Sequence, residues 1–133
     1  MTPDQSHADS YREGLGIRRE VLGDDYVDKS LAAVSEFSLP VQEFVTEYVW
    51  GAVWSREGLP RATRSMLNIA MLTALNRSHE LAVHVRGAIN NGVTPEEIRE
   101  VLLQTLVYVG APAALESFRV ADRVIKELAQ QHE

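Results

Sequence analysis

The sequence predicts an all-α protein, a compact bundle of about six to seven helices, on three observations. Apolar residues recur at helical spacing along most of the 133 residues. No stretch alternates between apolar and polar residues for long enough to form a strand. Glycine and proline stand where helices start and stop, and no repeat or low-complexity linker divides the chain. We therefore expect residues 1–133 to form a single domain.

The boundaries of the expected helices follow from residues that start or stop helices. Pro40 and Pro60 suit first turns, where proline loses no hydrogen bond. Gly23 and Gly92 suit C-termini, because glycine readily adopts the left-handed conformation found there. Residues 94–97, Thr-Pro-Glu-Glu, combine an N-cap, a first-turn proline and a capping-box glutamate. The expected helices are residues 11–22, a short helix that Asp24 or Asp25 caps, 41–54, 60–76, 78–91, 95–108 and a last helix to about Gln130.

The composition excludes several classes of function. The absence of cysteine excludes disulfides, thiolate nucleophiles and cysteine-ligated zinc. The net charge of −6 argues against general nucleic-acid binding, which needs a basic surface. The polar N-terminus lacks the apolar core of a signal peptide, and we expect residues 1–9 to be a disordered tail. The longest apolar stretch, 66–75, is too short to cross a membrane, so we expect a soluble, cytoplasmic protein.

Two of the expected helices carry more apolar surface than a chain of this size buries easily. Residues 60–76 hold no charge after Arg64, and residues 95–108 are apolar on most sides. A helix that is apolar all round is normally buried all round. We therefore expect self-association to supply the missing contacts and to give a homo-oligomer. A monomer with a thick core is the alternative.

The densest polar cluster inside an apolar stretch lies in the helix expected over 78–91. Glu80 and His84 are four residues apart and share a helix face. A carboxylate beside an imidazole raises the histidine pKa, so the pair suits proton transfer near neutral pH. His79 lies five residues before His84, about 140° around the helix, and cannot share a metal ion with it. The alternative for Glu80 and His84 is a solvated ion pair on a helix surface.

Further residues, on two of the expected helices, are candidates for binding a substrate. Arg61 and Arg64 open one of the expected helices, with Asn68 one turn beyond Arg64. They would form an anion site if that end of the helix lies beside His84. Solvated first-turn arginines are the alternative. Trp50 and the aromatic residues near it suit either a pocket wall or the core.

Several motifs, in a fixed order, carry a resemblance to a known family. They are Tyr-Val-Trp-Gly-Ala-Val-Trp at 48–54, Thr-Arg-Ser at 63–65, Ile-Ala-Met at 69–71, Ala-Leu-Asn-Arg at 74–77, Glu80-Leu81 with His84, Asn-Asn-Gly-Val-Thr at 90–94 and Tyr-Val-Gly-Ala-Pro at 108–112. Through these motifs the chain resembles the carboxymuconolactone decarboxylase family over nearly its whole length. In the alkylhydroperoxidase-like relatives, two cysteines stand where this chain has Arg77 and Glu80, and a glutamate falls near Ser65. The resemblance is therefore to the cysteine-free decarboxylase branch.

The resemblance implies an alkylhydroperoxidase-like fold, a homohexamer, and decarboxylation of a dicarboxylate lactone, 4-carboxymuconolactone, to 3-oxoadipate enol-lactone in aromatic catabolism. No cofactor, metal, membrane or nucleic acid would take part. His84 would stabilise the enolate and donate a proton, with Glu80 orienting it. Arg64, with Arg61, would hold a carboxylate, and Trp50 would line the ring pocket. The alternatives are a related decarboxylase, isomerase or cyclase acting on another small unsaturated or keto acid, or a non-catalytic helical oligomer that binds a small ligand.

Overall fold

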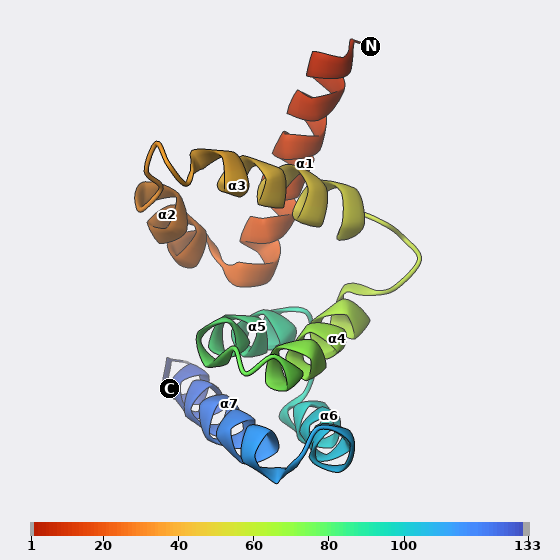
Figure 1. Cartoon of the computed structure of the whole chain (residues 1–133), viewed down its shortest axis with the longest axis vertical. Coiled ribbons are helices and arrows are strands. Elements are labelled where there is room, and N and C mark those ends of the chain that lie inside the picture. Colours follow the sequence, from red (N-terminus) through yellow and green to blue (C-terminus); the bar gives the residue numbers. More distant parts are fainter. Residues whose placement is uncertain (1, 132–133) are drawn as a thin grey trace. The chain divides into compact units, whose positions relative to one another are not determined.

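The computed structural model describes residues 2–131, and helices account for most of them. This part of the chain contains no strand, so the predicted all-α class is confirmed (Figure 1). None of its helices has the length and apolarity that a membrane crossing needs. The elements are α1 (Pro3–Leu22), α2 (Asp24–Ala32), α3 (Leu39–Phe44), a π-helical segment η1 (Val45–Val53), α4 (Arg61–Ala74), α5 (Ser78–Asn90), α6 (Pro95–Tyr108) and α7 (Ala111–Gln131).

Contacts between elements divide the chain into two compact units, Met1–Leu59 (unit 1) and Pro60–Glu133 (unit 2). Unit 1 contains α1, α2, α3 and η1, and unit 2 contains α4 to α7. Each unit has completely buried apolar side chains of its own, for example Val27 in unit 1 and Ile69 in unit 2. The single domain expected over the whole chain stays a prediction.

Helix α1 begins at Pro3, well before its predicted start. Residues 3–9, expected to belong to a disordered tail, are helical, so that prediction was wrong for them; the first residue of the chain lies outside the described part. The Thr2 hydroxyl caps the helix by accepting a hydrogen bond from the Gln5 amide at 3.2 Å. Asp4 adds negative charge at the positive end of the helix dipole. These two effects stabilise a first turn that polar composition alone does not reveal.

Two other boundaries in unit 1 differ from the predictions. Gly23, with φ of 91°, ends α1 and also precedes α2, so Asp24 and its neighbour lie in the first turn of α2 and do not cap it. The helix predicted over 41–54 is divided into α3 and the π-helical η1. At the end of η1 the Trp54 amide donates to the Val49 carbonyl, five residues back, at 3.0 Å. Hydrophobic spacing cannot reveal this division, because a π turn differs from an α turn by a single residue.

The predicted boundaries in unit 2 are confirmed to within about two residues, the usual uncertainty of a helix end. The clearest case is the start of α6. The Thr94 hydroxyl accepts a hydrogen bond from the Glu97 amide at 3.1 Å, and the Glu97 carboxylate accepts one from the Thr94 amide at 3.0 Å. This is the predicted capping box.

Helix α1 and segment η1 approach each other closely at two glycines. A Cβ atom added at Gly14 would collide with the backbone carbonyl oxygen of Thr46, and one added at Gly51 would collide with that of Ser10. Both obstacles are backbone atoms, which cannot rotate away as a side chain does. Glycine is therefore required on both sides of this crossing, where η1 carries Trp50.

We predict that Gly14→Ala lowers the free energy of unfolding by about 3 kcal/mol, the upper end of the usual cost of overpacking. Gly16→Ala is the matched control, because Gly16 lies in the same helix with nothing within 4 Å of an added Cβ. That variant is expected to stabilise the protein by about 0.5–1 kcal/mol, since alanine is the better helix former. Chemical unfolding of the two variants checks this, and equal stabilities would contradict the close crossing.

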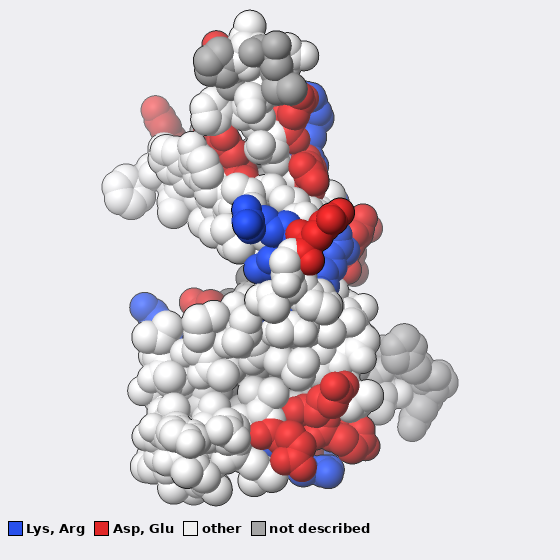
Figure 2. All heavy atoms as spheres, turned by 90° about the vertical axis from the view of Figure 1, so that its right-hand side faces the viewer, with Lys and Arg blue, Asp and Glu red and all other residues white. Residues whose placement is uncertain are grey.

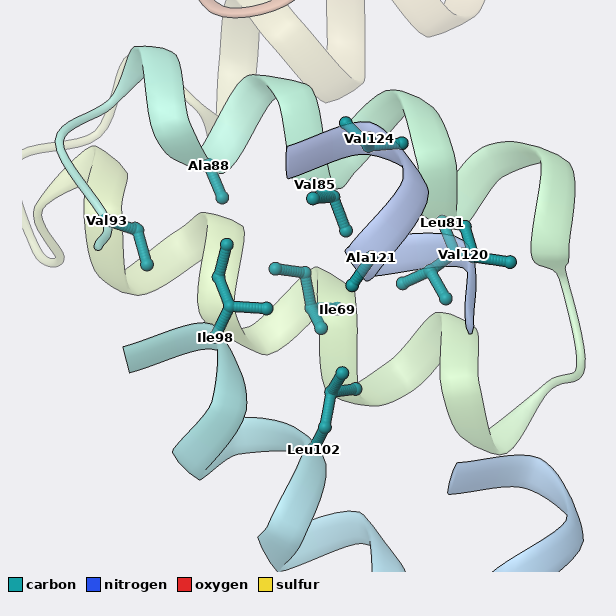
Figure 3. Close-up of a cluster of buried hydrophobic side chains, with 10 residues drawn as sticks. All are labelled: Ile69, Leu81, Val85, Ala88, Val93, Ile98, Leu102, Val120, Ala121 and Val124. Atoms are coloured by element: carbon teal, nitrogen blue, oxygen red, sulfur yellow. The ribbon is translucent and has the colours of Figure 1, made fainter. Parts of the chain in front are cut away.

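Unit 2 has one hydrophobic core, to which all four of its helices contribute (Figure 3). Ile69 from α4 and Val85 from α5 are completely buried, and Leu81 and Leu102 are each only 1% exposed. The core residues are Ile69, Leu81, Val85, Ala88, Val93, Ile98, Leu102, Val120, Ala121 and Val124. Packing around this core fixes α4 against α5, which is the pair of helices that carries most of the predicted site residues.

As the excess of apolar sequence predicts, a single chain does not bury α4 on all sides, and what covers its outer face stays a prediction. Leu67 is 47% exposed and Met71 is 53% exposed, because one face of α4 packs in the core and the other does not. On α6, Val107 is 77% exposed. Figure 2 shows broad uncharged areas on unit 2, with most of the acidic side chains seen there gathered in one cluster. Exposed apolar surface of this kind is common at protein–protein contacts.

Candidate active site

His84 lies on α5 with its ring partly buried against α4. Its Nδ1 atom is 3.4 Å from Nδ2 of Asn68, one turn beyond Arg64 on α4. The two helices are held in this register by the core around Ile69 and Val85. The structure thus places the neighbourhood of His84 beside the α4 face that begins with the two predicted arginines.

Burial lowers the pKa of His84 below its ordinary value of 6.5, and the charge of Glu80 only partly opposes this. We expected Glu80 to raise the pKa of His84 overall, and that expectation is wrong in its net direction. The physical reason is that Glu80 is exposed, so water screens its charge, whereas the imidazole is largely removed from water. The neutral form of His84, with one proton on its ring, therefore predominates at pH 7.

The lowered pKa predicts how the stability of the protein depends on pH. Because the folded pKa lies below 6.5, the unfolded chain takes up a proton at His84 at a higher pH than the folded chain does. Stability relative to a His84→Gln variant should therefore fall as the pH drops through 6.5, and the loss should be complete below the folded pKa. Unfolding free energies of both proteins between about pH 8 and pH 5 test this. A difference that stays constant, or grows, with falling pH would contradict the buried neutral ring.

The other predicted site residues are distributed over both units. Arg61 and Arg64 are partly buried in the first turn of α4, and Glu80 is exposed in the first turn of α5. Trp50 belongs to unit 1, where it is 4% exposed and stacks on Trp54 with 4.8 Å between ring centroids. The structure therefore brings His84, Arg61, Arg64 and Glu80 onto two packed helices, and the position of Trp50 relative to them stays a prediction.

A second contact between α4 and α5 had no signal in the sequence. The Nδ2 atom of Asn91, the C-cap residue that follows α5, donates a hydrogen bond to the Ser65 hydroxyl at 2.9 Å. Ser65 is completely buried. This contact holds the C-terminal end of α5 against the first half of α4. The hydrophobic core holds the middle of α5 against α4. The Asn-Asn-Gly motif alone indicates a turn and does not indicate its partner.

A groove of about 630 Å³ lies between α4 and α6 in unit 2, and His84 does not line it. Apolar side chains line much of this groove, and its charged lining residues are three glutamates and one arginine: Glu96, Glu97, Glu100 and Arg99. This excess of negative charge disfavours a substrate with two carboxylates. The groove therefore does not suit the substrate that the resemblance implies.

Residues 2–131 contain no group of three histidine, aspartate or glutamate side chains placed to hold a metal ion. The chain thus offers no candidate metal site in its described part, and independence from cofactors stays a prediction. The groups available for chemistry near α5 are a neutral imidazole, an amide from Asn68 and the guanidinium groups of α4. Such a set can bind an anion and donate a hydrogen bond to a developing negative charge.

Comparison with known proteins identifies the family. The sequence profile of the carboxymuconolactone decarboxylase family matches residues 40–123. A 4-carboxymuconolactone decarboxylase of Acinetobacter baylyi is 45% identical over 118 residues, covering 89% of this chain and 88% of the relative. A nitrosuccinic acid decarboxylase of Metarhizium robertsii is 41% identical over 132 residues, covering 99% of this chain and 92% of the relative. With its all-helical, alkylhydroperoxidase-like fold, the chain belongs to the carboxymuconolactone decarboxylase family.

Proposed function

We propose that this protein is a carboxy-lyase that converts 4-carboxymuconolactone to 3-oxoadipate enol-lactone and carbon dioxide without a cofactor. The observation that carries the proposal is 45% identity, over 89% of the chain, to a relative named for this reaction. The partly buried His84, on a helix packed beside arginine-bearing α4, supplies groups of the required kind. The substrate partner is a small dicarboxylate lactone, and the enzyme acts in the cytoplasm in the breakdown of aromatic compounds.

The reaction needs no cofactor because the substrate accepts its own electrons. When the ring carboxylate leaves as carbon dioxide, its bonding electrons pass through the ring double bond to the lactone carbonyl. The resulting dienolate is then protonated on carbon. The protein must hold two carboxylates, stabilise the enolate oxygen and supply a proton.

His84 is the residue we assign to the enolate oxygen. A neutral imidazole in a partly buried site donates a hydrogen bond to such an oxygen, an established role of neutral histidines in enolate chemistry. The ring proton passes to the substrate carbon as the ring takes a proton from water, so no imidazolate is left, and the hydroxide that forms combines with the released carbon dioxide as bicarbonate. Glu80 acts on the ring through its charge, which favours the protonated form against the effect of burial.

The arginines of α4 are assigned to the substrate carboxylates. Arg64 lies one turn before Asn68, the residue that contacts His84, and Arg61 lies one turn further toward the start of the helix. A guanidinium group binds a carboxylate with two parallel hydrogen bonds and so fixes its orientation. Trp50 is assigned to the wall of the ring pocket, as in the prediction from sequence.

A second candidate reaction is the decarboxylation of nitrosuccinic acid. The observation that favours it is 41% identity over 99% of the chain to the relative named for that activity. The chemistry is parallel, because a nitro group beside the leaving carboxylate accepts the electrons on its oxygens, and the substrate again carries a second carboxylate. A binding site with arginines and a neutral imidazole suits both acids.

Parallel assays of the two acids test the proposal. We expect turnover of 4-carboxymuconolactone by protein treated with a metal chelator, with a kcat/KM well above that for nitrosuccinate. A higher kcat/KM for nitrosuccinate would replace the proposed substrate but keep the reaction class. Turnover of neither acid by folded protein would contradict the proposed function.

We also propose that the protein assembles as a homohexamer. The exposed apolar residues of α4 and α6, including Leu67, Met71 and Val107, support self-association. Light scattering of the purified protein tests the assembly, and a monomeric mass at micromolar concentration would contradict it.

A further inference from the structure

The contact between Asn68 and His84 restricts where the ring proton of His84 can lie. A side-chain amide nitrogen only donates hydrogen bonds, and Nδ2 of Asn68 faces Nδ1 of His84 at 3.4 Å. Nδ1 can accept that bond only if it carries no proton. A neutral imidazole with a bare Nδ1 has its single proton on Nε2.

We propose that Asn68 is a positioning residue that holds His84 as the Nε2–H tautomer, so that the one ring proton points away from α4. The proposal rests on the function assigned to His84 above, because it is Nε2–H that would donate to the enolate oxygen. It goes beyond that function by naming the residue that selects the reactive form of the ring.

The surroundings of the two residues support this arrangement. The buried core around Ile69 and the hydrogen bond from Asn91 to Ser65 hold α4 and α5 together on either side of the contact. The amide of Asn68 is partly buried, so its hydrogen bond to the ring is protected from competition with water.

Charged groups also lie on the helices around the ring. On α5 these are Glu80, whose charge favours the protonated ring, and Arg86, which forms an ion pair with Glu127 of α7 at 3.6 Å. On α4 the charged residues are Arg61 and Arg64. A protonated ring would place an N–H group of Nδ1 against the N–H group of Asn68, so the contact also disfavours protonation.

Asn68→Asp is the variant that tests the proposal most sharply. A carboxylate of nearly the same shape only accepts hydrogen bonds, so it should move the ring proton to Nδ1 and raise the pKa of His84. Asn76→Asp is the matched control, because it adds the same charge at an exposed residue of unit 2. Asn68→Leu keeps a side chain of similar size that neither donates nor accepts a hydrogen bond.

The tautomer can be read without any substrate. In ¹⁵N–¹H correlation spectra recorded above the pKa of His84, the wild type and Asn76→Asp should show the proton on Nε2, and Asn68→Asp should show it on Nδ1. A proton on Nδ1 in the wild type would overturn the proposal, whatever the activity of the enzyme. The expected spectra without any decarboxylation would keep the tautomer assignment and overturn the proposed function instead.

The pH dependence of kcat supplies the second readout. The wild type should stay active as the pH rises above the pKa of His84, because Nε2–H is present in the neutral ring. In Asn68→Asp, Nε2 loses its proton as the pH rises through the raised pKa, so kcat should fall about tenfold for each further pH unit. Asn68→Leu should lose activity without this slope. Identical pH profiles for Asn68→Asp and Asn68→Leu would show that Asn68 only fills space and would overturn the proposal.

Discussion

Replacing His84 by alanine should lower kcat for 4-carboxymuconolactone by about 10²–10³-fold, because one preorganised donor to a developing oxyanion contributes that much. KM should change little, since the hydrogen bond strengthens only as charge develops on the lactone oxygen. The ring lies beside Asn68 at the interface of α4 and α5, so its removal leaves both helices packed on the buried core. Steady-state kinetics of the purified variant measure the effect.

His79→Ala is the control for this variant. His79 lies on the same helix but is exposed, and its replacement should leave kcat within about twofold of the wild type, as expected for surface substitutions of small effect. His84→Gln keeps an N–H donor and should retain more activity than His84→Ala. Equal losses of kcat in His79→Ala and His84→Ala would show that the substitutions act by disturbing the helix, and would remove the His84 imidazole from the proposed mechanism.

Replacing Arg64 by alanine should lower kcat/KM about ten- to hundredfold, the usual range for losing a hydrogen bond to a charged group. The loss should appear mainly in KM, because the carboxylate that Arg64 holds is present in both the substrate and the transition state. Arg64→Lys should recover only part of the loss, since an ammonium group cannot form the two parallel bonds of a guanidinium. Kinetics with the dicarboxylate lactone test this.

Arg119→Ala is the matched control for charge in the same unit. Arg119 is exposed on α7 and pairs with Glu116 at 3.1 Å, so its loss changes the net charge of the protein by the same amount as the loss of Arg64. It should leave kcat/KM near the wild-type value. Equal effects of the two variants would indicate general attraction of an anion to the protein, and would remove Arg64 from the site.

The sequence was most informative where a local signal decides the structure. The capping box at Thr94 and Glu97 fixes the start of α6 through two hydrogen bonds within one turn, and it was predictable in full. The N-terminus of α1 uses a related signal, Thr2 followed by proline and Asp4, and was missed because the residues after it are polar. Polar composition indicates exposure, which a helix on the surface shares with a disordered tail.

Features that depend on tertiary contacts could not be predicted in the same way. The net direction of the His84 pKa depends on how far the ring is buried by α4, whereas the spacing to Glu80 reveals only the opposing charge. Similarly, the partner of Asn68 lies 16 residues further along the chain, on another helix. The candidate residues Arg61, Arg64, Glu80 and His84 lie on two helices that pack on the same core, and their roles in a site stay predictions. The direction of the His84 pKa required the structure.

The measurement that tests the central claim most directly is the amount of carbon dioxide released per lactone consumed by the chelator-treated wild-type enzyme in deuterated water. Decarboxylation through a dienolate predicts one carbon dioxide per lactone and one deuterium on the carbon of the enol-lactone product. Consumption of the lactone without carbon dioxide would contradict the account, because it would make the protein an isomerase, a cyclase or a hydrolase.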